Sequence, residues 1–162
     1  MTSQYFSPAA VIDTATERTY NGGMDEKEQQ EAVTGQDKPV LVAALVCDVA
    51  VKDPTSGKIS LIGIFDRVHV KQFPANRPVS VYAKLTEAEG KYNFLVKYVY
   101  SNTGEKLAEA KGQFTSKDKL ATVELNLQFP PIPIPGEGRY DFQVWVNGQF
   151  LGQTFMDATG MP

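Results

Sequence analysis

The sequence is poor in the side chains that most often build reactive centres. Among its 162 residues there is one cysteine, Cys47, and one histidine, His69. A disulfide framework needs paired thiols, and a structural metal site needs several His, Cys or carboxylate ligands. A Ser-His or Cys-His catalytic pair would have to use His69 as its base. We therefore expect no metal, no cofactor and no catalytic residue.

Long apolar runs and an excess of positive charge are also missing. No stretch approaches the ~18 consecutive apolar residues that read as a membrane span. The net charge is −3 and the isoelectric point is near 5.2, so little Lys or Arg remains to bind phosphates or anionic lipids. Residues 1–11 lack the basic and apolar regions of a secretory signal, so we expect no signal peptide and a cytoplasmic or virion location.

Residues 1–38 differ in composition from the rest of the chain. They hold seven acidic and three basic residues, a net of −4, so residues 39–162 carry +1 of the total of −3. Apolar residues are sparse and aperiodic there, although a capping box at 25–28 allows a short helix over 25–34. We interpret 1–38 as an acidic arm. It is either a flexible tail or a segment that orders against a neighbouring subunit, with anchors at Tyr5, Phe6, Val11, Ile12 and Tyr20.

From Pro39 onward the apolar pattern has period two, which is typical of strands. Residues 40–51 are apolar on both faces at first, which predicts a strand in the middle of a sheet. A tight turn over 53–58 leads to a returning strand over 59–70, and Gly63 within it suggests a bulge or a close backbone approach. Four further strands are expected near residues 79–86, 92–100, 107–114 and 120–129.

Turn residues recur about every 8–12 positions, as in sandwiches of short antiparallel strands. We predict an all-β fold: an antiparallel immunoglobulin-like β-sandwich of seven or eight strands over residues 39–158, with a short tail over 159–162. One domain is expected at this length.

The last third of the chain contains the clearest local signals. Four prolines over 130–135 predict an extended crossing from one sheet to the other. Tyr140, just after a glycine turn, indicates a tyrosine corner. Asn147-Gly148 predicts a type I′ hairpin turn. The resulting register places one set of side chains on the core face, namely Tyr140, Phe142, Val144, Val146, Leu151 and Phe155, and leaves Trp145 and Phe150 on a polar face.

Several stretches resemble a family of uncharacterised bacterial and phage-associated domains. They are Cys47-Asp48, the run GKISLIGIFD over 57–66, Phe73-Pro74 and the run GRYDF over 138–142. The resemblance covers residues 40–158 and leaves the arm outside. It implies an immunoglobulin-like fold, and it assigns no functional residue because that family is described as a domain of unknown function.

The few candidate reactive residues favour structural roles. His69 alternates with apolar neighbours near a strand end, and Cys47 lies in the most apolar strand, where a thiol is usually inert. Asp48 and Asp66 could form an ion pair with Arg67 or Lys58. Glu87 and Glu89 fall in a turn. No phosphate loop is present, and the loop at 53–57 offers one carboxylate for calcium.

Protein association is therefore the function we expect. The hypothesis is a non-catalytic structural or interaction module of a multi-subunit assembly, such as a filament, a coat or a phage particle, that self-associates or binds another protein. Trp145 and Phe150 would lie in or beside the contact, unless the arm or a loop covers Trp145. The alternative is a carbohydrate or small-ligand binding module that stacks sugars on Trp145, Tyr82 or Tyr98.

Overall fold

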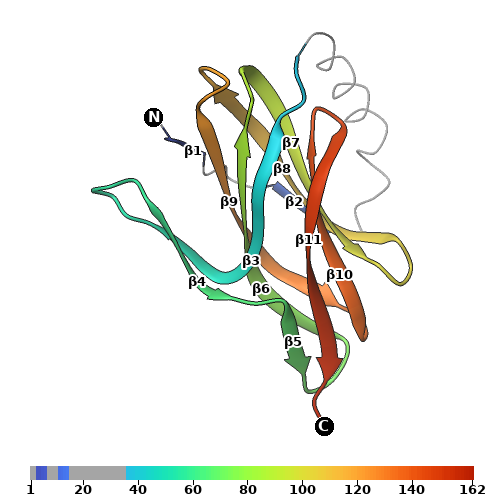
Figure 1. The fold of residues 1–162 in the computed structure, drawn as a ribbon. Coiled ribbons are helices and arrows are strands. Elements are labelled where there is room, and N and C mark those ends of the chain that lie inside the picture. The colour runs from blue at the N-terminus through green and yellow to red at the C-terminus, as the bar shows by residue number, and fades with distance from the viewer. Residues whose placement is uncertain (1–2, 7–10, 15–35) are drawn as a thin grey trace.

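The computed structural model describes residues 3–6, 11–14 and 36–162, which form two β-sheets packed face to face (Figure 1). The strands are β1 (Ser3–Phe6), β2 (Val11–Thr14), β3 (Val40–Lys52), β4 (Ile59–Ile64), β5 (Arg67–Val70), β6 (Ala75–Thr86), β7 (Gly90–Tyr100), β8 (Glu105–Ser116), β9 (Thr122–Ile134), β10 (Gly138–Val146) and β11 (Gln149–Gly160). One sheet has the order β1-β9-β6-β3-β4 and the other the order β2-β8-β7-β10-β11-β5. Every pairing is antiparallel except β1 with β9 and β11 with β5. The all-β prediction is confirmed, with nine strands from β3 to β11.

The core lies between the two sheets and is built by alternate residues of the long central strands. In β9, for example, Val123, Leu125 and Leu127 point inward and are at most 1% exposed. The facing sheet contributes Phe94, Tyr98 and Phe142, which are buried to the same degree. This is the period-two pattern of a sandwich whose outer faces contact solvent.

The predicted tyrosine corner is confirmed at the start of β10. Tyr140 is fully buried, and its hydroxyl donates to the Gly136 carbonyl at 2.7 Å while accepting from the Gly136 N–H at 3.1 Å. The ring stacks on Tyr98 and on Tyr100, with centroids 5.4 and 4.7 Å away. Burial raises the pKa of the Tyr140 phenol. The corner thus fixes the turn that carries the chain from one sheet to the other.

Replacing Tyr140 with phenylalanine should lower the free energy of unfolding by about 0.5–1.5 kcal/mol, because the half-buried Gly136 carbonyl and N–H lose their hydrogen-bond partner. Tyr100→Phe is the matched control. Its hydroxyl also donates to a backbone carbonyl, that of Glu137 at 2.7 Å, but at an exposed position where water can replace it. Urea titration of both variants checks the difference, and equal losses would show that the corner contributes nothing special.

The proline-rich segment does not cross between the sheets as predicted. It remains in β9 and pairs with β6, so that Ile134 lies opposite Ala75 and Ile132 opposite Arg77. Ile132 and Ile134 are each 1% exposed, and burying two such side chains contributes about 1.5–3 kcal/mol apiece. A register shift between Arg77 and Val79 accommodates the adjacent prolines. The crossing occurs one step later, at the turn before β10.

The hairpin of β10 and β11 has the predicted turn and one unpredicted bulge. Asn147 and Gly148 have positive φ angles of 47° and 74°, and Trp145 lies opposite Phe150 as expected. The register then shifts by one residue, so Val144 lies opposite Gly152 rather than Leu151. An extra residue in one strand turns all later side chains to the other face. Phe155 is therefore opposite Asp141 on the outer face, and its assignment to the core was wrong.

The returning strand predicted over 59–70 is two strands. β4 pairs with β3 in the first sheet, whereas β5 pairs with β11 in the second, so the chain changes sheets at residues 65–66. The turn between β3 and β4 is as predicted, with a Gly57 φ of 72° and hydrogen bonds between Asp53 and Lys58 and between Gly57 and Asp53.

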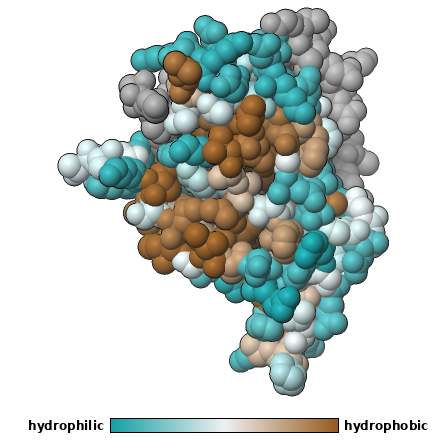
Figure 2. All heavy atoms as spheres, in the orientation of Figure 1, coloured by the Kyte–Doolittle hydropathy of each residue, from teal (hydrophilic) through white to brown (hydrophobic). Residues whose placement is uncertain are grey.

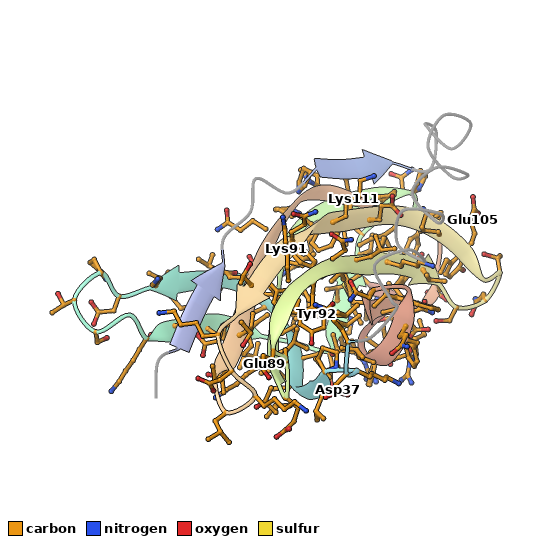
Figure 3. The ribbon with its side chains drawn as sticks, turned by 90° about the horizontal axis from the view of Figure 1, so that it is seen from above. Asp37, Glu89, Lys91, Tyr92, Glu105 and Lys111 are labelled. Atoms are coloured by element: carbon orange, nitrogen blue, oxygen red, sulfur yellow. The ribbon has the colours of Figure 1, made fainter. Side chains whose placement is uncertain are left out.

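Residues 36–38 lead into β3 and are attached to one end of the sandwich. This is the end that faces the viewer in Figure 3. The Tyr92 hydroxyl lies 3.2 Å from the Asp37 carbonyl, and Asn147 donates to the Gln36 side chain at 3.0 Å. Lys119 forms an ion pair with Asp37, and that contact lowers the pKa of the Asp37 carboxyl. Residues 36–38 are thus anchored to the body.

Two stretches of the expected arm lie along this chain's own sheets. Residues 3–6 form β1 beside β9, and residues 11–14 form β2 beside β8. These strands include the backbone of the expected anchors Tyr5, Phe6, Val11 and Ile12. The remaining anchor, Tyr20, and the expected helix over 25–34 lie outside the described residues.

Candidate interaction surface

The hairpin of β3 and β4 extends beyond the sandwich as a two-stranded ribbon. β3 pairs with β6 only as far as Cys47, which lies opposite Ser80, and from Val49 onward its one partner among the described strands is β4. Figures 1 and 3 both show the ribbon projecting from the body. Along its inner side, Asn126 of β9 donates to the Ala50 carbonyl at 3.4 Å, and Ala50 is 5% exposed. The ribbon thus has one side held against the body.

The other side of the ribbon is apolar and open to solvent. Val49 lies opposite Ile62, and Ile64 lies opposite Cys47 on the same face, with Val51 two positions beyond Val49. The exposed fractions are 43% for Val49, 47% for Val51, 56% for Ile62 and 57% for Ile64. We call these four side chains the hairpin patch. Figure 2 shows hydrophobic side chains gathered over β3 and β4 on this face.

An exposed patch on a two-stranded ribbon is unusual for physical reasons. Isolated hairpins are marginally stable in water, and a β-ribbon normally gains its stability by burying one apolar face. Contiguous apolar patches on a folded surface commonly mark sites of contact with another molecule. The prediction that residues 40–51 lie in the middle of a sheet is therefore wrong. Among the described strands, residues 40–46 pair with β6 on one side and residues 49–52 pair with β4 on the other, and Cys47 alone is paired with both.

The base of the ribbon is held in a fixed position. The Arg77 guanidinium of β6 lies 2.6 Å from a carboxylate oxygen of Asp48, and it covers the Phe65 ring at 4.8 Å from the centroid. Gly63, with a φ of 69°, allows Asp48 to approach so closely that a Cβ atom there would lie 2.3 Å from its Oδ2. A bulge or a close backbone approach was predicted at Gly63, and the structure shows a close approach made by the Asp48 side chain. The prediction that Asp48 forms an ion pair with Arg67 or Lys58 is wrong. Asp48 pairs with Arg77 instead, and both side chains are about half exposed.

β4 is also an edge strand. It ends its sheet, so one row of its backbone N–H and C=O groups has no neighbouring strand in the described chain. Its sequence, ISLIGI, contains no charged residue and no proline. Natural edge strands usually carry such residues, which discourage pairing with other chains, and β5 at the edge of the other sheet has exposed Arg67 and His69. β4 lacks this protection.

The predicted contact residues Trp145 and Phe150 form a second, smaller surface. They lie opposite each other on the outer face of β10 and β11, with ring centroids 5.5 Å apart, and Phe150 is 42% exposed. The Trp145 ring is half-buried, because the Lys97 ammonium lies 4.2 Å from its centre and its Nε1 donates to Gln143. The indole is thus engaged within its own sheet.

The other proposed sugar platforms are engaged as well. Tyr98 is fully buried in the core, and its hydroxyl donates to the Pro133 carbonyl at 2.9 Å, so its assignment to an exposed site was wrong. Tyr82 is half-buried and donates to Glu124 at 2.9 Å. Burial raises the pKa of both phenols. The structure does not assemble an aromatic platform from Trp145, Tyr82 and Tyr98.

A shallow hollow at the C-terminal end of the second sheet is lined by charged residues. Arg139 donates two hydrogen bonds to Asp157, at 2.8 and 3.0 Å, and its guanidinium lies 3.7 Å from the centre of the Phe155 ring. The hydrogen bonds from Arg139 lower the pKa of the Asp157 carboxyl. Arg67 and Glu137 complete the lining. Two cations face two carboxylates here, so no net charge remains to attract an ion.

The residues considered for chemistry are dispersed. His69 is exposed, and its Nδ1 lies 3.0 Å from the Thr159 hydroxyl. Cys47 is fully buried as a free thiol, and burial raises its pKa. Glu87 and Glu89 are exposed in a turn. Within the described ranges, no group of three or more His, Cys, Asp or Glu side chains is placed to hold a metal ion.

Sequence reasoning missed the hairpin patch, although one signal for it was present. Residues 40–51 and 59–64 are apolar at both odd and even positions, and for 40–51 this pattern predicts burial on both faces. However, two strands joined by a tight turn cannot both be central in one sheet unless each has a second neighbour. The strand leading back from the turn changes sheets at residues 65–66, so it had none on its outer side.

A family model matches residues 42–158, and it is described as a family of unknown function (DUF6941). The chain belongs to this family. The match runs from the third residue of β3 to Ala158 in β11, and it includes the hairpin and its patch. No curated protein matches the sequence. The family therefore defines the body of the protein without assigning it an activity.

Among solved structures, the chain is similar to the Pseudomonas fluorescens alkylpurine DNA glycosylase AlkC bound to DNA containing an abasic site analog. The two are 15% identical with a TM-score of 0.39, and the similarity covers 71% of this chain. This chain spans 30% of that one. A similarity at this level carries no functional argument. In the part of the chain that the structure describes, no helix is long and apolar enough to cross a membrane.

Proposed function

We propose that the protein is a non-catalytic interaction module that binds another protein chain through the β3–β4 hairpin. The observation that carries the proposal is the hairpin patch: four aliphatic side chains, each 43–57% exposed, on a ribbon that projects from the body. Burial of such side chains in a contact is favourable at about 25 cal/mol per Å². The uncharged edge of β4 adds a row of backbone hydrogen-bonding groups with which another strand can pair.

The proposal retains the assembly role and the immunoglobulin-like sandwich, but it changes the expected contact residues. Trp145 contacts Lys97, Gln143 and Phe150 within its own sheet, whereas no comparable cover lies over Ile62 and Ile64 among the described residues. We therefore place the main contact on the hairpin patch and leave Trp145 and Phe150 outside its centre. The carbohydrate alternative has no observation in its favour.

Photocrosslinking from the hairpin tests this function. A benzophenone amino acid would replace Val51 in the full chain, expressed in the cells that naturally make the protein. We expect an adduct of defined mass with another polypeptide after irradiation, because Val51 lies within the proposed contact. The matched control places the same group at Gln113, an exposed position on β8 of the other sheet. Equal adducts from both positions, or none from Val51, would contradict the proposal.

A further inference from the structure

We infer that the strand bound by β4 is β4 of a second copy of the same chain, paired antiparallel about a two-fold axis at Ile62. This inference rests on the proposed function and names the partner of that same surface. A two-fold contact needs a patch that is complementary to itself. β4 meets this requirement because its six residues carry no charge that would be repelled by their own copy.

The register follows from which side chains must share a face. Antiparallel residues that lie opposite each other point to the same face, so the sum of the two paired residue numbers must be even for the two hairpin patches to join. Centring the pair on Ile62 places Ile62 opposite Ile62 and Ile64 opposite Ser60. The two patches then form one continuous apolar surface, and each Ile62 covers the other.

The charges at both ends of β4 select the same register. With Ile62 at the axis, Lys58 of each copy lies next to the end of β4 in the other copy, where Asp66 is exposed at the step to β5, so opposite charges come together at both ends. Lys58 and Asp66 are both exposed, and the Phe65 N–H donates to the Val46 carbonyl at 3.1 Å, so the strand continues to the residue before Asp66. Centring on Leu61 instead would place Lys58 opposite the apolar Ile64. The Ile62 register is therefore the one that joins the patches and matches the charges.

The structure also leaves this edge accessible. The opposite edge of the same sheet is occupied by β1 of the same chain, and one edge of the other sheet by β2. The base of the ribbon is held by Asp48, Arg77 and Phe65, so little order has to be created when a second copy binds. A contact made by one strand pair belongs to the class of small interfaces, below about 1,200 Å², which are weak. We expect reversible dimers that grow between about 1 µM and about 1 mM.

Disulfide trapping in the full chain tests the register. Residues directly opposite in a strand pair have Cβ atoms about 4.5–5.5 Å apart, close enough for a disulfide after a small adjustment. Ile62→Cys should form a covalent dimer under mild oxidation. Ser60→Cys alone and Ile64→Cys alone should not, whereas a mixture of the two chains should form the mixed dimer. All three variants are made in a Cys47→Ala background, because the free Cys47 thiol lies opposite Ile64 in β3 and could pair with Ile64→Cys within one chain. The Cys47→Ala chain without a further substitution is the control.

The outcomes separate this inference from the proposed function. Sedimentation of the unsubstituted chain as a monomer up to about 1 mM, or trapping of Ile62→Cys no faster than of Ser60→Cys, overturns the two-fold pairing. If crosslinking from Val51 then captures a different polypeptide, the interaction function stands and only the identity of the partner is wrong. Because all three cysteine positions are at or near the surface, circular dichroism spectra matching the parent show that the variants are folded.

Discussion

Replacing Phe142 with alanine should lower the free energy of unfolding by about 3–5 kcal/mol, the usual cost of removing a buried aromatic ring. Phe142 is fully buried on β10, with ring centroids 5.0 Å from Tyr98 and 5.9 Å from Phe129. Its removal leaves a cavity between the two sheets that neighbouring rings cannot fill. Guanidinium titration followed by circular dichroism measures the loss.

Phe150→Ala is the matched control for Phe142→Ala, because both phenylalanines belong to the same hairpin. Phe150 is 42% exposed and contacts Trp145 at 5.5 Å, so its loss should cost less than about 1.5 kcal/mol. Phe155→Ala should also cost less than Phe142→Ala, because the bulge at Leu151 places Phe155 on the outer face. A loss at Phe155 as large as that at Phe142 would contradict the register of β11.

Gly63→Ala should be the most damaging single change in the hairpin. A φ of 69° costs a residue with a side chain about 1–2 kcal/mol, and the added Cβ would lie 2.3 Å from the Asp48 Oδ2. Asp48 would have to leave Arg77, its partner at 2.6 Å. We expect a loss of about 2–3 kcal/mol in the free energy of unfolding, together with lower association through the hairpin, since the base of the ribbon shifts.

Gly57→Ala separates the two causes of that loss. Gly57 has a φ of 72°, and no atom lies within 4 Å of the position its Cβ would take. It should therefore show the backbone strain alone, about 1–2 kcal/mol. Adding Asp48→Ala to Gly63→Ala should recover the part of the loss caused by the collision. Identical losses at Gly57 and Gly63 would mean that Asp48 is not held where the structure places it. Thermal unfolding of the three variants and the unsubstituted chain gives the comparison.

Local signals in the sequence were sufficient to predict the structure at positions where the backbone conformation requires one residue type. Asn147-Gly148 and Gly57 adopt the positive φ angles that their turns need, and Tyr140 forms the corner that its position after a glycine turn indicates. In each case the interaction spans a few residues, so the sequence alone contains both partners. The period-two pattern likewise predicted the buried face of β9.

Predictions from the sequence were wrong where tertiary packing decides which of two local structures forms. Proline propensity predicted a crossing over 130–135, but burial of Ile132 and Ile134 keeps the segment in β9. One bulged residue, Leu151, reversed the faces of the strand that follows. The hairpin patch was missed because an apolar pattern on both faces is the same for a central strand and for a ribbon with an open binding face. Only the strand order distinguishes the two.

Hydrogen–deuterium exchange of the full chain, compared between dilute and concentrated solutions, tests most directly whether β4 receives another strand. The free edge of β4 should exchange rapidly at low concentration, and its amides should gain protection as pairing satisfies them. We predict that peptides covering 59–64 become slower to exchange on concentration, while those covering 67–70, on the charged edge strand β5, do not change. Exchange at 59–64 that is slow at every dilution, or equally fast at every concentration, would contradict the pairing of β4 with β4 of a second copy.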